Sequence, residues 1–208
     1  MNTRIAGLYA ITPDLEDTAD LCYRARAALA GGARVLQYRN KAASPALRLE
    51  QARALQALCA ARGVPLIIND HLELALQTGA AGLHLGGDDG DIAAARAALG
   101  PDRLLGASCY DRLELAERAR AAGADHVAFG SFFPSGVKPG AVRPPPALLA
   151  EARRRLDLPV VAIGGITATN APQLIAAGAD AVAVISAVFA APDVEAAARE
   201  IQSLFELH

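Results

Sequence analysis

Short apolar segments alternate with helix-like stretches along the whole chain. Eight segments rich in Val, Ile and Leu span residues 7–12, 34–39, 65–70, 82–86, 104–109, 126–132, 159–165 and 181–186. Segments of this length and composition are typical of β-strands. Between them, stretches such as LRLEQARALQALCAA place apolar residues at helical spacing. The pattern predicts eight strands separated by helices.

The residues that separate these segments also repeat. A proline stands before or at the start of the third, fifth and seventh segments, at positions 65, 101 and 159. A Gly-Ala pair precedes the second, fourth, sixth and eighth segments, as Gly32-Ala33, Gly79-Ala80, Gly123-Ala124 and Gly178-Ala179. Glycine commonly follows the end of a helix because it adopts a left-handed conformation without strain. A unit of two strands and two helices therefore repeats along the chain.

Eight strand–helix units favour a single-domain (β/α)₈ TIM barrel, an α/β fold that here spans residues 1–208. The alternative is an open, doubly wound parallel sheet. A dinucleotide-binding version of that sheet would carry a GxGxxG motif after its first strand, and the sequence has none there.

Composition narrows the class of protein. Hydrophobic residues make up 53% and charged residues 20%, which is typical of a globular chain, and the net charge of -2 argues against a general nucleic-acid binder. Membrane helices need about 18 consecutive apolar residues, and no segment approaches that length. The three cysteines share no metal-ligand spacing. We expect a cytoplasmic protein that binds neither nucleic acid nor membrane.

The second predicted strand ends in the polar run Gln37-Tyr38-Arg39-Asn40-Lys41. Strand alternation places Gln37, Arg39 and Lys41 on one face. In a TIM barrel the chemistry lies at the carboxyl ends of the strands, and cations held there need anionic partners. The run predicts a site for an anionic ligand, and the alternative is a solvated loop with a structural ion pair.

Two neighbouring strands are followed by carboxylates. Asn69-Asp70 ends the third strand and Asp89 follows the fourth. Carboxylates beside a site that also holds cations suit Mg²⁺ that bridges to phosphate oxygens. The alternative is helix capping, which we favour for Asp88, whereas Asp70 and Asp89 are predicted metal ligands.

Three further features belong to the same predicted rim. Loops after the seventh and eighth strands commonly bind phosphate in this fold, which favours an anion site at Gly165 and Ser186. A Gly- and Pro-rich loop that follows the sixth strand carries Lys138 and is a candidate lid. Ser108 has no base nearby in sequence, so we expect it to bind substrate, and His84 is interpreted as a packed, hydrogen-bonded histidine.

An ordered set of motifs resembles the thiamine phosphate synthase family. From about Gly7 to Ser186 the chain reads LYAITPD, QYRNK, LIIND, GLHLGGDD, GAS, GSFFPSGVK, PVVAIGGI and GADAVAVIS. The resemblance implies a (β/α)₈ barrel enzyme that uses Mg²⁺. It also implies that a hydroxymethylpyrimidine diphosphate and a thiazole phosphate condense and release diphosphate by a dissociative mechanism.

The family's functional residues map onto this chain. The resemblance implies catalytic roles for Arg39, Lys41, Ser108 and Lys138, and Mg²⁺ ligation by Asp70 and Asp89. It implies substrate binding by Gln37, Tyr38, Arg39, Asn40, Lys41, Asn69, Ser108, Ser135, Gly136, Lys138, Gly165, Ile185 and Ser186. Gly87, Ser135 and Val137 depart from the family pattern.

Two other functions stay open. A related thiazole tautomerase has the same fold and need not bind a diphosphate, and a non-catalytic barrel would bind phosphate ligands to regulate a partner. The joint presence of Arg39, Lys41, Asp70, Asp89 and Lys138 favours the synthase. The sequence does not fix the oligomeric state, and a homo-oligomer is one outcome.

Overall fold

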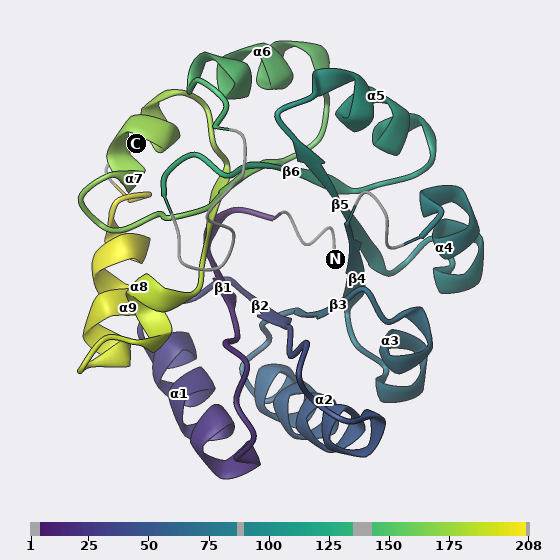
Figure 1. The fold of residues 1–208 in the computed structure, drawn as a ribbon, viewed down its shortest axis with the longest axis vertical. Helices are drawn as coiled ribbons and strands as arrows, with labels where there is room; N and C mark the ends of the chain where they lie inside the picture. The colour runs from purple at the N-terminus through teal and green to yellow at the C-terminus, as the bar shows by residue number, and fades with distance from the viewer. Residues whose placement is uncertain (1–4, 87–89, 135–142, 207–208) are drawn as a thin grey trace.

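The computed structural model describes residues 5–86, 90–134 and 143–206. Eight parallel strands pair in sequence order, and β1 also pairs with β8, so the sheet is a closed barrel (Figure 1). The strands are β1 (Gly7–Ile11), β2 (Val35–Tyr38), β3 (Leu66–Asn69), β4 (Gly82–Leu85), β5 (Leu104–Tyr110), β6 (His126–Gly130), β7 (Val160–Ile163) and β8 (Ala181–Val184). The predicted TIM barrel is confirmed, and the open sheet is wrong because the β1–β8 pairing closes the barrel.

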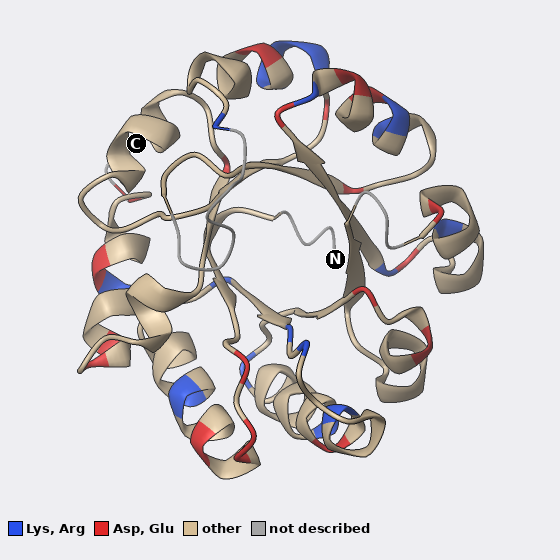
Figure 2. Ribbon diagram, in the orientation of Figure 1, with Lys and Arg blue, Asp and Glu red and all other residues tan. Residues whose placement is uncertain are grey.

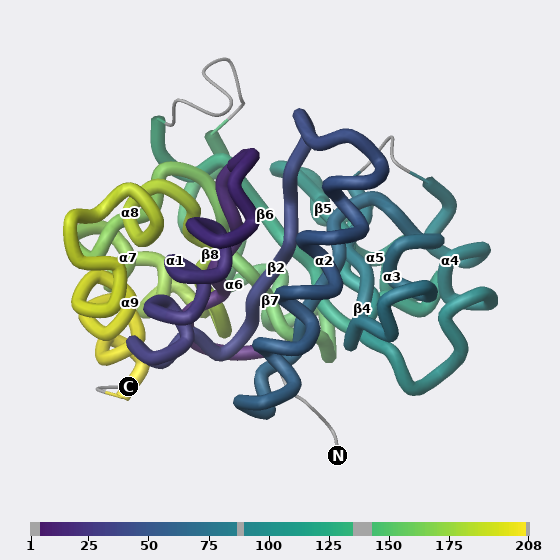
Figure 3. Tube along the Cα trace, turned by 90° about the horizontal axis from the view of Figure 1, so that it is seen from below, coloured from purple at the N-terminus to yellow at the C-terminus, as the bar shows by residue number. Residues whose placement is uncertain are grey.

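Helices cover the outside of the barrel, as the views down and across its axis show (Figures 1 and 3). They are α1 (Thr18–Ala30), α2 (Pro45–Ala60), α3 (Leu72–Thr78), α4 (Ile92–Leu99), α5 (Leu113–Ala121), α6 (Ala147–Arg155), α7 (Ala171–Ala176), α8 (Ser186–Phe189) and α9 (Val194–Ser203). Charged side chains lie mainly on these helices and the connecting loops, while most of the barrel wall is uncharged (Figure 2). Among the described residues, no helix is long and apolar enough to span a membrane.

Strand alternation divides the apolar residues into two layers. Outward-facing residues such as Leu36 and Ile68 join the large core between the strands and the helices. Inward-facing residues such as Tyr9 and Ile67 form a smaller cluster inside the barrel. Because successive side chains point to opposite faces, the position of each residue along its strand decides whether it faces the barrel interior or the helices.

The repeated Gly-Ala pairs end helices in the same way at all four places. Each alanine N–H donates to the carbonyl five residues earlier, as Ala33 does to Ala28 and Ala80 to Ala75. The preceding glycines have positive φ angles, for example 66° at Gly79, which is the geometry that favours glycine after a helix. The predicted role of these glycines is confirmed.

Candidate active site

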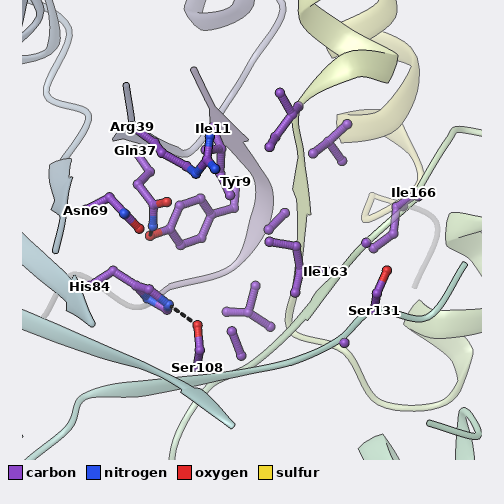
Figure 4. Close-up of a pocket in the computed structure, with 18 of the residues that line it drawn as sticks. Tyr9, Ile11, Gln37, Arg39, Asn69, His84, Ser108, Ser131, Ile163 and Ile166 are labelled. Atoms are coloured by element: carbon purple, nitrogen blue, oxygen red, sulfur yellow. Dashed lines mark hydrogen bonds between the residues drawn. The ribbon is translucent and has the colours of Figure 1, made fainter. Parts of the chain in front are cut away.

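A cavity of about 540 Å³ opens at the carboxyl ends of the strands. It receives side chains from all eight strands, and Figure 4 shows the labelled ones pointing into it from around the barrel. Such a concave space with a few convergent polar groups is the usual form of a small-molecule site. The lining residues include Tyr9, Gln37, Arg39, Lys41, Asn69, Asp70, His84, Ser108, Tyr110, Ala128, Val161, Ile163, Gly165, Ala183, Ile185 and Ser186.

Arg39 and Lys41 line one part of this cavity, as the alternation of β2 predicts. The backbone of Arg39 is held by Thr12, whose hydroxyl accepts from the Arg39 N–H at 2.9 Å and donates to the Arg39 carbonyl at 3.0 Å. Arg39 Nη1 also donates to Asp14 Oδ1 at 3.3 Å, and the Lys41 backbone N–H donates to the same oxygen at 3.0 Å. Sequence reasoning missed Asp14, which holds the Arg39 side chain and the Lys41 backbone.

Gln37 of β2 and Asn69 of β3 place amide groups on the cavity wall next to Arg39. Gln37 is buried, and its Nε2 donates to the Tyr9 hydroxyl at 2.8 Å. Burial raises the pKa of Tyr9, so this phenol stays protonated at neutral pH. Tyr9 and Tyr110 also line the cavity and were not predicted, although their positions in inward-facing registers of β1 and β5 identify them.

Tyr38 and Asn40, which are predicted substrate contacts, are not among the residues that line the cavity, and their side chains bind other parts of the barrel. Tyr38 faces the helix layer, where its hydroxyl donates to Gln51 Oε1 at 2.8 Å. Asn40 Nδ2 donates to the Leu15 carbonyl at 2.7 Å and to the same Gln51 oxygen at 3.1 Å. The physical reason is the alternation of the strand, which turns these two residues away from the face of Arg39.

Asp70 lines the cavity beside Asn69, whose amide Nδ2 donates to Asp70 Oδ2. Asp70 adopts a left-handed backbone with φ 62°, which is uncommon for a residue other than glycine and recurs at functional sites. Helix α3 begins after His71 and has no side-chain cap, so Asp70 is not its N-cap. Among the described residues, no three His, Cys, Asp or Glu side chains cluster as a metal site.

Several predicted residues lie outside the described ones. These are Gly87, Asp88 and Asp89 after β4, and Ser135, Gly136, Val137 and Lys138 after β6. The prediction that Asp88 caps the next helix is wrong, because the N-cap of α4 is Asp91, whose carboxylate accepts from the N–H groups of Ala93 and Ala94. The capping residue lies three positions further along because the helix begins at Ile92.

Ser108 has a histidine partner that its sequence neighbourhood did not indicate. Ser108 Oγ lies 2.9 Å from His84 Nε2, across the pair of adjacent strands β4 and β5 (Figure 4). His84 also lines the cavity, so the interpretation of this histidine as packed and hydrogen-bonded holds but omits its exposure to the site. Only the strand register brings the two side chains together.

A glycine-rich turn after β7 and the residues after β8 form another part of the cavity. Gly165, Ile185 and Ser186 all line it. Gly165 has φ 62°, and a Cβ there would lie 2.3 Å from the Pro134 carbonyl oxygen, so a side chain would collide with backbone. Asn170, which sequence reasoning missed, fixes the turn by donating to the Gly165 carbonyl at 3.0 Å.

Known proteins with similar sequences identify the family of this chain. A family model described as thiamine monophosphate synthase matches residues 8–188. The thiamine-phosphate synthase of Thioalkalivibrio sulfidiphilus is 56% identical over 205 residues, which cover 98% of this chain and 97% of that relative. The thiamine-phosphate synthase of Azoarcus sp. is 58% identical over 193 residues, 93% of this chain and 94% of the relative.

The solved structures agree with the sequence relatives. Thiamine phosphate pyrophosphorylase from Pyrococcus furiosus superposes with a TM-score of 0.86 and 33% identity, covering 97% of this chain and 96% of that one. A 3-hexulose-6-phosphate synthase structure, with a TM-score of 0.72 and 21% identity, shares the fold alone. The chain belongs to the thiamine-phosphate synthase family.

Proposed function

We propose that the protein condenses a hydroxymethylpyrimidine diphosphate with a thiazole phosphate to give thiamine phosphate and diphosphate. The observation that carries the proposal is that one cavity is lined both by the Arg39 and Lys41 cations and by the Gly165–Ser186 corner. Between them the wall is apolar, with Val161, Ile163 and Ala183, which suits two heteroaromatic rings. The chain is also 56% identical to a thiamine-phosphate synthase over 98% of its length, which supports the same reaction.

The diphosphate of the pyrimidine substrate is assigned to the β2–β3 side. The Arg39 side chain is only 17% exposed, whereas Asp14, its anionic partner among the described residues, is 41% exposed and near solvent. A bound diphosphate would supply the anionic charge that a partly buried guanidinium needs. Lys41, with its backbone held by Asp14, adds a second cation to the same place, and Lys138 is the residue that the family resemblance adds.

The residues fit a Mg²⁺ ion at this side. Asp70 supplies a carboxylate at the cavity, and one or two carboxylates together with substrate phosphates are the usual ligands of this ion. Asp89 is the second proposed ligand. When bound, Mg²⁺ would neutralise charge on the diphosphate and make it a better leaving group.

The proposed reaction proceeds by departure of the diphosphate before the new bond forms. The bond between the pyrimidine methylene carbon and the diphosphate oxygen breaks, and the electron pair leaves with the oxygen. Arg39 and Lys41 stabilise the charge that develops there, which is electrostatic catalysis by groups already in position. The thiazole nitrogen then donates its lone pair to the methylene cation. Ile163 and the neighbouring apolar wall limit access of water to that cation.

The thiazole phosphate is assigned to the corner formed after β7 and β8. Gly165 lines this corner, and its lack of a side chain lets the turn pack against the Pro134 carbonyl. Ser186 adds a hydroxyl donor, and Ser135 and Gly136 are the further contacts that the family resemblance implies. The Asn170 side chain holds this turn in place by donating to the Gly165 carbonyl.

The decisive experiment mixes both phosphorylated substrates with the purified protein and follows thiamine phosphate and diphosphate. We expect both products in equal amounts, and we expect a chelator to abolish them and added Mg²⁺ to restore them. Replacement of the cavity carboxylate in Asp70→Asn should lower kcat/KM by about a hundredfold or more, because the Mg²⁺ that would stabilise charge on the leaving diphosphate loses a ligand. The matched control is Asp157→Asn, whose side chain is 94% exposed and should turn over normally.

The same assay separates the other two functions. A thiazole tautomerase would isomerise a thiazole carboxylate phosphate and release no diphosphate from the pyrimidine substrate. A non-catalytic barrel would bind both ligands without turnover. Equal activity of Asp70→Asn and Asp157→Asn would remove Asp70 from the proposed machinery.

A further inference from the structure

Two histidines and a glycine lie level with one another inside the barrel. His84 of β4 is paired with Gly106 of β5, and Gly106 is paired with His126 of β6. All three positions face inward, since their neighbours along each strand, such as Leu83, Leu105 and Val127, belong to the outer core. The two imidazole rings therefore stand on either side of a glycine, with centroids 5.6 Å apart.

Gly106 leaves space that the two rings fill. A Cβ built at Gly106 would lie 2.4 Å from His84 Nδ1 and 2.2 Å from His126 Nε2. Both nitrogens thus lie beside the same point above the glycine, although no hydrogen bond joins them. Any larger residue at this position would push the rings apart, so the glycine is what allows these two nitrogen atoms to face one another.

His126 is fully buried, and neither of its ring nitrogens has a hydrogen-bond partner among the described residues. Burial, with a smaller contribution from His84, lowers the pKa of His126 to about 3. The ring is therefore neutral at physiological pH, with one N–H and one bare lone pair. Such a buried polar group requires an explanation, because leaving it unsatisfied is costly.

The facing nitrogens restrict the tautomers of the two rings. Two N–H groups or two lone pairs this close together repel, which favours the proton on one nitrogen and a lone pair on the other. If His126 Nε2 lacks the proton, its Nδ1–H is left as a buried donor without a partner. If Nε2 carries it, only a lone pair is left at Nδ1. In the second arrangement the N–H lies beside the His84 Nδ1 lone pair, whereas in the first it lies at His126 Nδ1, which has no acceptor among the described residues, so the second arrangement is favoured.

We propose that His126 is a positioning residue that fixes His84 as the Nε2–H tautomer, so that His84 donates to Ser108 and the Ser108 hydroxyl proton is directed into the cavity. The 2.9 Å contact between His84 Nε2 and Ser108 Oγ is the link that transmits the choice. Ser108 would then donate to a ring nitrogen or a phosphate oxygen of the bound substrate. This role rests on the proposed function, although the tautomer itself does not.

The first test therefore uses the free protein. The chain has only four histidines, so long-range ¹H–¹⁵N NMR of ¹⁵N-histidine-labelled protein can resolve every imidazole after assignment with single variants. We expect His84 to carry its proton on Nε2 in the wild type, and the Nδ1–H form to become populated in His126→Phe, which keeps a ring but removes both nitrogens. A wild-type His84 protonated on Nδ1 would overturn the proposal, even if the Phe variant failed to fold.

The second test is a double-mutant cycle in the synthase assay. Loss of one well-placed hydrogen bond should raise KM for the pyrimidine diphosphate about tenfold in His126→Phe, with a smaller effect on kcat. Because His126 acts through Ser108, the same change made in a Ser108→Ala background should have little further effect. Fully additive effects would assign His126 to packing alone. Absence of turnover in the wild type would instead refute the proposed function and leave the NMR result standing.

Discussion

At the scale of single residues, Asp14 is the clearest test of how the cations are held. Its Oδ1 accepts from both Arg39 and the Lys41 backbone. In Asp14→Asn the amide oxygen still accepts the backbone N–H, but the charge that orients Arg39 is lost. Since a partly exposed ion pair is worth about 0.7 kcal/mol, we expect about a threefold change in KM for the pyrimidine diphosphate and little change in stability. Steady-state kinetics and thermal unfolding measure the two effects.

The control for this variant is Asp157→Asn, which removes an exposed ion pair on the outside of the barrel. An unchanged KM in Asp14→Asn would show that Arg39 is positioned by its backbone contacts with Thr12 alone. Alternation alone predicts that Arg39 faces the site, but it does not predict Asp14, whose pairing joins the loops after two different strands. The same alternation places the Tyr38 side chain on the opposite face, toward the helices, although the family resemblance implies a substrate contact for this residue.

At the scale of elements, two aspartates tie strands together at their amino ends. Asp180, just before β8, accepts from the Val160 N–H at 2.9 Å and from Arg153 at 3.1 Å. Asp125, just before β6, accepts from the Leu105 N–H at 2.7 Å in the same way. We expect Asp180→Ala to lower the free energy of unfolding by about 1–3 kcal/mol, because the Val160 N–H loses its acceptor.

Asp180→Asn is the matched variant, since its amide oxygen can still accept, and it should lose less stability than Asp180→Ala in urea unfolding. Both variants should keep their activity, because this end of a TIM barrel serves stability and the opposite end serves chemistry. Loss of turnover in a folded Asp180→Asn protein would contradict that division.

The elements themselves were largely predictable, and their ends were not. All eight strands lie where the apolar segments predicted them, because a glycine or proline stands at or shortly before the start of each segment. The sixth strand ends at Gly130, two residues before the predicted end, since the chain there leaves the sheet to form the cavity rim. The apolar pattern after β8 likewise does not distinguish two separate helices, α8 and α9. Loop geometry depends on contacts between distant segments, which local patterns do not contain.

At the scale of the whole molecule, closure of the barrel creates the environment that sequence patterns cannot reveal. The count of eight units predicts closure, and closure buries His126 completely. Its folded pKa of about 3 lies below the ordinary value of about 6.5 expected for the unfolded chain. As the pH falls below 6.5, the unfolded state binds a proton and the folded state does not. The associated stability is therefore complete above pH 6.5 and is lost as the pH falls toward 3.

This linkage predicts a difference between wild type and His126→Phe. From pH 7 to pH 5 the wild type should lose about 2 kcal/mol more unfolding free energy than the variant, because the carboxylates that also titrate are common to both and cancel. Urea unfolding at the two pH values measures the difference. His126→Leu should show the same pH-dependent part despite a different absolute stability, since neither replacement titrates. Equal acid sensitivity of all three proteins would mean that the ring is protonated, or reaches solvent, in the folded state.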